Sequence, residues 1–346
     1  MHVGIIGGGG ISDTHARAAL AVPGVKVAAV YGSNREKVAR LAREYGGDPY
    51  EDFDRFLAHR PMDFVAIGSP SGLHAEQGIA AARRGLHVLV EKPLDITTGR
   101  ADALIAAADA SGVKLGVFFQ DRLRPAIRTM KLIVDSGQLG LPVMISGRVK
   151  WYRPPEYYGK SRWRGTWALD GGGALMNQGI HTVDLLLWLF GPVARVHAAT
   201  ATRLHNIEVE DTAAAVLEFQ SGALGTIEAG TSLYPGYDRR VEMTGSKGTI
   251  VLEHDRLARI DLQSAPVGLD NASGPADTTT SSSSPVVSDA SAHARIIEDF
   301  VRAIESNQVP ACDGREGRRS VALVEAIYES ARTHEPVFIP KPKPKA

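Results

Sequence analysis

The chain has 346 residues, enough for two domains of ordinary size. Its 39 basic and 39 acidic side chains balance, so no charge excess indicates binding to nucleic acid or to a membrane surface. Cys312 is the single cysteine, which excludes an internal disulfide and a cysteine-based metal site, and we expect no metal. We expect a cytoplasmic protein, because the chain enters an apolar strand at Val3 without a signal-type leader.

The first segment predicts a strand, a glycine turn and a helix. The strand covers His2 to Ile6, four glycines follow, and a helical pattern continues to Leu20. Such a turn lets the backbone approach a pyrophosphate, and the helix N-terminus offers unpaired amides. Two of the glycines match the first two positions of the dinucleotide-binding fingerprint, while Ser12 stands at the third. The expected contacts with a dinucleotide are Gly7, Gly9, Gly10 and Ile11.

The second predicted strand, Val25 to Tyr31, ends where a dinucleotide-binding unit reads the adenosine ribose. NAD-binding units usually have an acid there, but this chain has Gly32. A hydroxyl, an amide and a guanidinium follow, a set that suits a 2′-phosphate: Ser33, Asn34 and Arg35. We therefore expect NADP to be preferred, with NAD possible. The alternative is an ordinary polar turn that begins the helix from Glu36 to Tyr45.

Strands and helices continue to alternate up to residue 119. The predicted strands are Phe64 to Gly68, Val88 to Val90 and Lys114 to Phe119, and the predicted helices are Leu73 to Arg84 and Thr97 to Ala110. This alternation predicts an α/β domain with a doubly wound parallel sheet, which we place at residues 1–121.

The strand Val88 to Val90 ends abruptly in an acid, a base and a proline, Glu91-Lys92-Pro93. In an open parallel sheet, ligands bind in the crevice beyond the carboxyl ends of the strands. We therefore expect Glu91 and Lys92 to lie where the chemistry occurs. A solvated charge pair at a strand end is the alternative interpretation.

The period changes after residue 121. Beyond a helix from Pro125 to Ser136, apolar and polar residues alternate, which is typical of antiparallel strands. These strands are predicted at Val143 to Trp151, Val193 to Thr202, Thr212 to Phe219, Ala223 to Thr231, Arg239 to Thr244, Thr249 to Leu252 and Leu257 to Leu262. With the helices Ser291 to Ser306 and Glu316 to Thr333 they form a second domain, 122–340. Residues 270–291 are predicted to be an exposed loop and 341–346 a frayed tail.

Three glycines, 171–173, precede a predicted helix that carries four polar or aromatic residues on one face: Asn177, His181, Asp184 and Trp188. We interpret the glycines as leaving room for a ligand, and the histidine as a candidate base. A structural hydrogen-bonding role for the histidine is the alternative.

The order and spacing of these motifs resemble the glucose-fructose oxidoreductase and inositol dehydrogenase family of NAD(P)-dependent enzymes. Further matches along nearly the whole chain are His15 after the glycine turn, Ser69-Pro70 with His74, and Arg122 with Pro125. The resemblance implies a Rossmann domain followed by an α/β domain with a large open, mostly antiparallel sheet.

The resemblance also implies roles for individual residues. It assigns Lys92 to the reacting hydroxyl, Glu91 to the nicotinamide ribose and His181 to catalysis, and it implies a cis peptide bond before Pro93. Asn177 stands where many polyol dehydrogenases of the family have an aspartate, so the imidazolium form of His181 should be less favoured. The other implied contacts are Ser69, Pro70 and His74 with the cofactor, and Arg122 with the substrate.

The segment Trp151 to Gly165 resembles the substrate loop of nucleotide-sugar and glycoside dehydrogenases, and Trp163 and Arg164 are the expected sugar contacts. The same aromatic residues could instead close an interface. The implied reaction is hydride transfer between a nicotinamide and a secondary alcohol of a sugar, glycoside, nucleotide sugar or cyclitol. The alternatives are a redox-neutral NAD-dependent glycosidase and a non-catalytic NADP(H) sensor. The open sheet face favours a homodimer or homotetramer.

Overall fold

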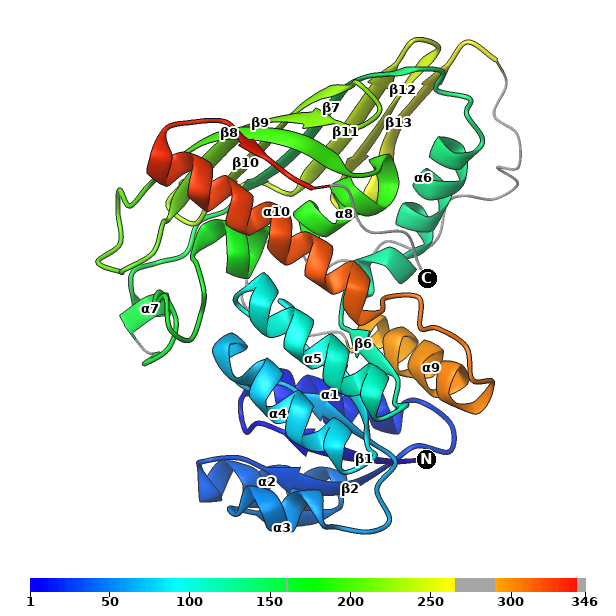
Figure 1. Cartoon of the computed structure of the whole chain (residues 1–346), viewed down its shortest axis with the longest axis vertical. Helices are drawn as coiled ribbons and strands as arrows, with labels where there is room; N and C mark the ends of the chain where they lie inside the picture. Colours follow the sequence, from blue (N-terminus) through cyan, green and yellow to red (C-terminus); the bar gives the residue numbers. More distant parts are fainter. Residues whose placement is uncertain (160, 265–289, 341–346) are drawn as a thin grey trace. The chain divides into compact units, whose positions relative to one another are not determined.

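The computed structural model describes residues 1–159, 161–264 and 290–340 (Figure 1). These residues form two compact units. The first unit contains residues 1–120 and 290–318. The second contains residues 121–159, 161–264 and 319–340. The predicted tail at 341–346 and nearly all of the predicted loop at 270–291 lie outside the described residues.

In the first unit, six parallel strands form one sheet in the order β3-β2-β1-β4-β5-β6. The strands are β1 (His2–Ile6), β2 (Lys26–Tyr31), β3 (Asp48–Tyr50), β4 (Phe64–Ile67), β5 (His87–Val90) and β6 (Leu115–Val117). All four residues of β4 are buried, as expected for a central parallel strand that is covered on both faces. The predicted doubly wound parallel sheet is therefore confirmed.

Six α-helices accompany this sheet: α1 (Gly10–Leu20), α2 (Arg35–Tyr45), α3 (Phe53–Leu57), α4 (His74–Arg83), α5 (Thr98–Ala110) and α9 (Ser291–Glu305). The sequence analysis did not identify β3 or α3. With three and five residues, each is too short to show a hydrophobic period, and β3 includes Pro49.

The sequence analysis placed the helix that begins at Ser291 in the second domain, but this helix, α9, belongs to the first unit. This helix packs against α1 in the first unit, and the Phe300 ring lies 5.7 Å from the ring of Phe64 on β4. The apolar stripe of an amphipathic helix shows that the helix is covered, but it does not show which sheet covers it.

In the second unit, eight strands form a sheet in the order β13-β12-β11-β7-β10-β9-β8-β14. They are β7 (Pro142–Lys150), β8 (Val193–Ala201), β9 (Thr212–Phe219), β10 (Leu224–Gly230), β11 (Arg240–Gly245), β12 (Gly248–Glu253), β13 (Arg256–Leu262) and β14 (Val337–Phe338). The pair β7–β10 is parallel, and the other pairs are antiparallel. The predicted mostly antiparallel sheet is confirmed.

Helices cover one face of this sheet (Figure 1). These are α6 (Pro125–Asp135), α8 (Ile180–Phe190) and the second-unit part of α10 (Gly314–Thr333), while the short α7 (Glu156–Gly159) lies in the loop after β7. Ile145 and Val149 of β7 point to the covered face and are fully buried. Alternate residues therefore leave the opposite face open, as the resemblance implied.

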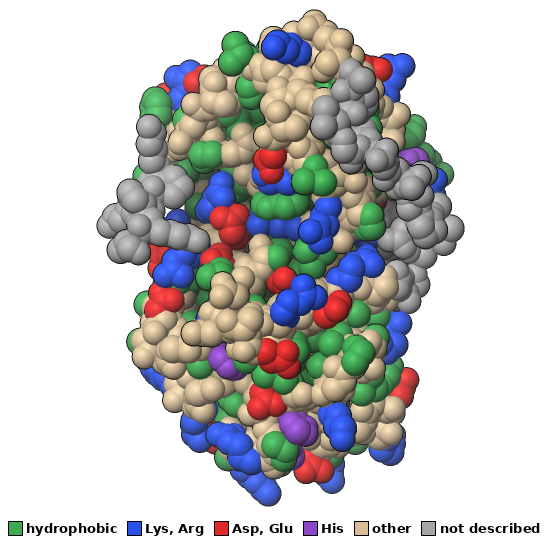
Figure 2. All heavy atoms as spheres, turned by 90° about the vertical axis from the view of Figure 1, so that its right-hand side faces the viewer, with side chains coloured by type: hydrophobic (Ala, Val, Ile, Leu, Met, Phe, Trp, Pro, Cys, Tyr) green, Lys and Arg blue, Asp and Glu red, His purple; other side chains and the backbone are tan. Residues whose placement is uncertain are grey.

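The open face is mixed in character. Val216, Leu224 and Met144 are about half exposed on it, and an ion pair joins Lys150 and Glu228 across β7 and β10 at 2.6 Å. On the face of the molecule in Figure 2, basic and acidic side chains are likewise interspersed. Among the described helices, none combines the length and apolar character needed to cross a membrane.

Candidate active site

The glycine turn between β1 and α1 has the geometry that a dinucleotide site requires. Gly7 has φ 125°, and a Cβ at this position would lie 2.4 Å from the Ser12 hydroxyl. Gly9 and Gly10 are exposed, and a Cβ on either would meet no described atom within 4 Å. Ile11, the next residue, is half-buried. The start of α1 therefore faces open space, where its backbone amides can approach a phosphate.

The segment after β2 supplies two exposed cations, Arg35 and Lys37. Arg35 is 83% exposed, and its Nε lies 3.4 Å from a carboxylate oxygen of Glu51. Asn34 caps α2, because its side-chain oxygen accepts a hydrogen bond from the Lys37 backbone amide at 3.0 Å. Ser33 is exposed. Asn34 is one of the three predicted contacts with the ribose phosphate, and its side-chain oxygen already has a partner in the Lys37 amide.

His74 joins two loops at the carboxyl edge of the parallel sheet. Its Nδ1 lies 2.8 Å from the Pro93 carbonyl oxygen, and its Nε2 lies 3.0 Å from the Ser69 carbonyl oxygen. Burial lowers the pKa of His74 against the opposing effect of these two acceptors, and a neutral ring donates to only one of them. His74 therefore links the backbone of Ser69 to that of Pro93. Ser69, whose hydroxyl donates to Gln77 at 2.6 Å, and Pro70 remain partly exposed.

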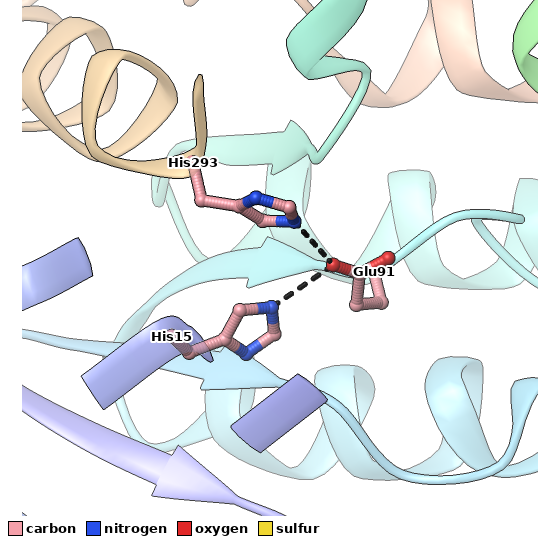
Figure 3. A group of neighbouring side chains, drawn as sticks. All are labelled: His15, Glu91 and His293. Carbon is pink, nitrogen blue, oxygen red and sulfur yellow. Dashed lines mark hydrogen bonds and ion pairs between the residues drawn. The ribbon is translucent and has the colours of Figure 1, made fainter. Parts of the chain in front are cut away.

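Glu91 lies between two buried histidines (Figure 3). Its Oε1 is 3.0 Å from His15 Nε2 and 3.4 Å from His293 Nε2, while its Oε2 accepts a hydrogen bond from the Lys92 backbone amide at 3.1 Å. The His15 ring stacks on Phe118 with 4.3 Å between centroids. Burial alone would raise the pKa of the Glu91 carboxyl, but the two histidines hold it well below its usual range. Glu91 is therefore a buried carboxylate, and its implied contact with the nicotinamide ribose stays a prediction.

Lys92 follows directly at the carboxyl edge of the sheet. Its side chain is half-buried, and the peptide bond between Lys92 and Pro93 is cis, as the resemblance implied. The predicted location of this charged pair beyond a buried parallel strand is confirmed by the end of β5 at Val90.

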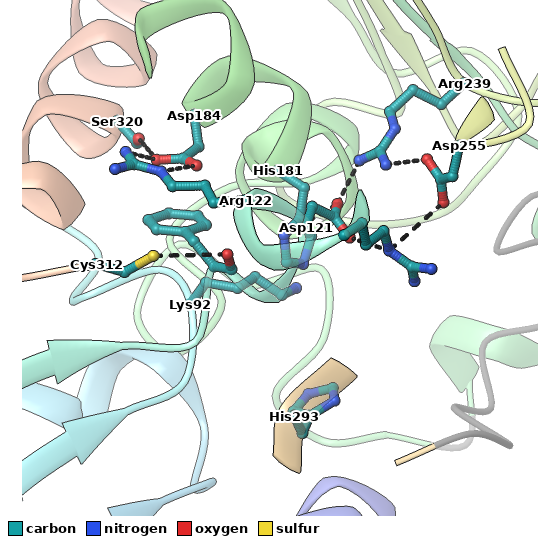
Figure 4. A network of polar contacts seen from close by, with 12 residues as sticks. Lys92, Asp121, Arg122, His181, Asp184, Arg239, Asp255, His293, Cys312 and Ser320 are labelled. Carbon is teal, nitrogen blue, oxygen red and sulfur yellow. Dashed lines mark hydrogen bonds and ion pairs between the residues drawn. The ribbon is translucent and has the colours of Figure 1, made fainter. Parts of the chain in front are cut away.

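In the second unit, His181 lies beside a buried network of charges (Figure 4). Asp121 Oδ2 is 3.7 Å from His181 Nδ1 and 2.5 Å from Arg239, and Asp121 Oδ1 is 3.0 Å from Arg124. Arg239 also pairs with Asp255. Burial would raise the pKa of Asp121, but the charges of Arg239, His181 and Arg124 hold it well below its usual range. His181 therefore has an anionic neighbour that residue 177 alone did not predict.

Arg122, a predicted substrate contact, forms a buried bidentate pair instead. Its Nε and a terminal nitrogen lie 2.8 and 2.5 Å from the two carboxylate oxygens of Asp184. The Ser320 hydroxyl donates to the same carboxylate at 3.2 Å, and the guanidinium lies 5.5 Å from the centroid of the Trp188 ring. With 3% exposure, Arg122 is committed to a structural pair between α8 and the start of this unit (Figure 4).

Asn177 is held by a buried acid. Its Nδ2 donates to Asp170 Oδ1 at 2.5 Å, and its Oδ1 accepts from Gln178 Nε2 at 2.8 Å. Gln178 also donates to the Tyr157 hydroxyl at 2.9 Å, which ties this helix to the predicted substrate loop. Asn177 lies in the π-helical turn Ala174–Gly179, which precedes α8 and replaces the first turns of the predicted α-helix. Such π-helical turns are frequent at functional sites.

Of the three glycines before this turn, Gly172 and Gly173 do not leave room for a ligand, and for these two that interpretation was wrong. A Cβ on Gly173 would lie 1.7 Å from the Glu210 carbonyl oxygen, and one on Gly172 would lie 2.1 Å from the Tyr328 hydroxyl. The Glu210 carboxylate accepts hydrogen bonds from the amides of Gly173 and Leu175 and from Tyr328, at 2.8–2.9 Å. The glycines therefore allow Glu210 and Tyr328 to fix the helix that carries His181.

The aromatic side chains of the predicted substrate loop have different surroundings. The Arg164 guanidinium lies 4.6 Å from the Tyr157 ring centroid and 5.2 Å from that of Trp163. Arg164 and Trp163 are both partly exposed, whereas Tyr158 is buried and hydrogen-bonds Thr231. The two predicted sugar contacts therefore form one aromatic and cationic cluster, while Tyr158 closes the core.

Several of these residues were not identified from the sequence. The missed acids and bases are Asp121, Asp170, Glu210, Arg239 and His293, and all are buried or nearly so. No fixed spacing along the chain links any of them to its partner in the fold. A buried acid requires a partner, so the pair Glu210-Asp211 at the start of a predicted strand was the one available signal.

Comparisons with known proteins agree with this geometry. The model described as "Oxidoreductase family, NAD-binding Rossmann fold" matches residues 1–119, and the GFO/IDH/MocA C-terminal domain model matches residues 127–251. The structure is similar to the WlbA dehydrogenase from Bordetella pertussis, solved with NADH and UDP-GlcNAcA, with a TM-score of 0.89, 32% identity and 98% of each chain covered.

Two curated relatives extend the comparison. D-xylose 1-dehydrogenase (NADP(+)) 2 of Haloferax volcanii is 29% identical, with 96% of this chain and 98% of the relative covered. Inositol 2-dehydrogenase of Rhizobium meliloti is 27% identical, with 98% and 99% covered. The chain therefore belongs to the GFO/IDH/MocA family of oxidoreductases, and its first unit is the NAD-binding Rossmann domain of that family.

Proposed function

We propose that the protein transfers a hydride between a nicotinamide and a secondary alcohol carbon of a sugar, glycoside, nucleotide sugar or cyclitol. This proposal rests on the Glu91-Lys92-Pro93 segment, which lies at the carboxyl edge of the Rossmann sheet. The glycine turn after β1 in the same unit is open. Relatives that act on xylose and inositol, and one solved with a nucleotide sugar, support the substrate class.

The protein residues manage one proton and the developing oxygen charge, while the bound nicotinamide supplies the hydride acceptor or donor. Lys92 would donate to the substrate oxygen and stabilise alkoxide character. His181 would accept the hydroxyl proton, directly or through Lys92, and its Nδ1 lies 3.7 Å from the Asp121 carboxylate. Asn177 would orient the substrate through its amide, which Asp170 fixes.

The test is replacement of Lys92 by Met. We expect Lys92→Met to abolish turnover while the cofactor dissociation constant stays nearly unchanged, because the glycine turn is untouched. Lys26→Met, at an exposed position on β2, is the matched control and should retain full activity. Substantial kcat in the Lys92 variant would contradict the assignment. Release of nitrophenol from a glycoside without a net change in nicotinamide absorbance would favour the glycosidase alternative.

Trp163 and Arg164 would form the sugar-binding part of the site. Aromatic faces pack on the C–H faces of a sugar ring, and the guanidinium can donate to its hydroxyls. A panel of sugars, cyclitols and nucleotide sugars, each assayed with both cofactors, would identify the substrate. Trp163→Ala should raise KM for the correct substrate much more than it changes the cofactor dissociation constant.

For the cofactor, we propose a preference for NADP. Gly32 places no carboxylate after β2, and Arg35 is an exposed cation that a 2′-phosphate could take over from Glu51. We also propose a homodimer or homotetramer that covers the open face of the second sheet, where Val216 and Leu224 are half exposed. A monomer in sedimentation at micromolar concentration would contradict the latter.

A further inference from the structure

We propose that His293 is a positioning residue, which holds the Glu91 carboxylate from the opposite side to His15 and thereby fixes the backbone that presents Lys92. His293 belongs to α9, about 200 residues beyond the strand that carries Glu91, yet it lies in the same compact unit. The proposal rests on the proposed function only where it assigns Lys92 a role in turnover.

The first step is the hydrogen-bond accounting around Glu91 (Figure 3). His15 and His293 both direct Nε2 at Oε1, and the Lys92 backbone amide donates to Oε2. The Nδ1 atoms of both histidines are buried and have no hydrogen-bond partner among the described residues. A proton on Nδ1 would be an unsatisfied buried donor, so the tautomer with the proton on Nε2 is favoured for both rings.

The second step is the charge. Glu91 is 6% exposed, and a carboxylate with so little water requires donors to remain ionised. Burial lowers the pKa of His15, so this ring is neutral and contributes one N–H. His293 brings the second ring nitrogen to the same oxygen. Without it, Oε1 would keep one side-chain donor, and the carboxyl group would be free to rotate or to take up a proton.

The third step connects this cluster to Lys92. Oε2 accepts from the Lys92 amide, so the orientation of the carboxylate and that of the Glu91–Lys92 peptide are coupled. Displacing a reacting group by ~1 Å can cost on the order of 100-fold in rate. A change at His293 should therefore appear at Lys92, although α9 itself carries none of the predicted cofactor contacts.

The cluster also has the composition of a metal site, because its three candidate ligand atoms lie within 4.8 Å of one another. Metal-bound histidines usually donate the second ring N–H to a carboxylate or a carbonyl. Neither Nδ1 has such an acceptor in the described part of the chain. Hydrogen bonding alone accounts for the arrangement, and the experiment below separates the two cases.

The experiment compares His293→Leu with His293→Gln, whose amide nitrogen can take the place of Nε2. We expect His293→Leu to lower kcat by ~10- to 100-fold while the cofactor dissociation constant changes less than about threefold, and His293→Gln to restore most of kcat. Phe300→Leu is the control, because it weakens the packing of α9 on Phe64 without touching Glu91. It should lower the melting temperature and leave kcat nearly unchanged.

A second readout does not depend on turnover. After reductive ¹³C-methylation, the Lys92 resonance, assigned with Lys92→Arg, should shift in His293→Leu and return in His293→Gln. If the wild type has no dehydrogenase activity, the proposed function fails, but this resonance still tests the positioning. An unchanged Lys92 resonance, or a Gln variant as impaired as the Leu variant, would overturn the proposal. One zinc ion per purified wild-type chain, lost in His293→Leu, would also overturn it in favour of a metal site.

Discussion

Asp170 accepts a hydrogen bond from the side-chain amide of Asn177, with 2.5 Å between Oδ1 and Nδ2. The resemblance implies an aspartate at the position of Asn177 in many polyol dehydrogenases of the family, and in this chain the carboxylate beside that position belongs to Asp170. Asp170 is 1% exposed, and its Oδ2 also accepts from the Gly165 amide at 2.9 Å. The acid therefore has a structural task, which is to hold the amide of Asn177 in one orientation.

Introducing the aspartate should therefore destabilise this chain. In Asn177→Asp two carboxylates would face each other, and one must stay protonated, which raises its pKa in the folded state above the unfolded value. Stability should be fully present near pH 4 and below, close to the ~3.9 pKa of an unfolded aspartate, and fall by roughly 2 to 3 kcal/mol as the pH rises to 8. Urea unfolding at both values measures this. Asn177→Ala, which loses the hydrogen bond without adding charge, should show the same loss at both values.

The sequence predicted most of the fold because the signals were local. The strand β9, for example, was predicted with the bounds that the structure has, since Ala213, Ala215, Leu217 and Phe219 alternate with residues on the open face. The assignment of α9 to the first unit was not predictable in this way. It depends on the contact between Phe300 and Phe64, which are 236 positions apart in the sequence, and no periodic pattern encodes such a pairing.

Glu210 should make the stability of the second unit depend on pH near neutrality. Burial raises the pKa of Glu210 from 4.5 to about 7, although Leu175, Gly173 and Tyr328 donate to it. A raised pKa in the folded state means that the stability is fully present below pH 4.5 and is lost as the pH rises through 7. The expected loss between pH 5 and pH 8 is ~3 kcal/mol.

The matched variant is Glu210→Gln, which keeps one of the two acceptor oxygens and cannot ionise. Its unfolding midpoint in urea should change little over the same pH range, so that the difference between variant and wild type isolates Glu210. Equal pH dependence in the two proteins would show that Glu210 does not titrate in this interval.

The stability that Asp121 contributes should depend on pH in the opposite direction to that of Glu210. Its pKa is depressed mainly by Arg239 against the effect of burial, so the stabilisation is present above its ordinary value of 3.8 and is lost as the pH falls below it. Asp121→Asn leaves Arg239 and Arg124 with one fewer carboxylate and should cost about 3 kcal/mol at pH 7. The exposed control Asp102→Asn, which loses a surface pair with Arg318, should cost less than ~1 kcal/mol.

Prediction of the site was strongest where one strand end determines the position and weakest where the neighbours of a side chain decide its role. Glu91 and Lys92 were located from the end of a buried strand, and β5 ends directly before them. The roles of Arg122 and of two of the three glycines were not recoverable, because they depend on Asp184 and Glu210, which the chain supplies 62 and 37 residues later. Side chains compete for partners in three dimensions, and spacing along the chain does not record that competition.

Cofactor selectivity should depend on Arg35 and its neighbour Glu51. The Arg35 guanidinium lies 3.4 Å from Glu51 in an exposed pair, and such a pair contributes little stability. A 2′-phosphate carries more charge than a carboxylate, so it should displace Glu51 from Arg35. Arg35→Ala should then weaken NADP binding by ~10- to 100-fold and leave NAD binding unchanged. Titration of the apoenzyme with each dinucleotide measures both constants.

Two further variants separate the charge from the space at this position. Glu51→Gln removes the competing acid and should tighten NADP binding alone.

Gly32→Asp should move the preference toward NAD. Its Cβ would lie 3.1 Å from Val38 and 3.3 Å from the carbonyl carbon of Gly7, so Gly32→Ala is needed as a control for crowding. If Gly32→Ala lowers the affinity for both dinucleotides equally and Gly32→Asp lowers that for NADP further, repulsion of the 2′-phosphate is the cause. A ratio of the two dissociation constants that stays at the wild-type value in Arg35→Ala, Glu51→Gln and Gly32→Asp would mean that the segment after β2 is an ordinary polar turn.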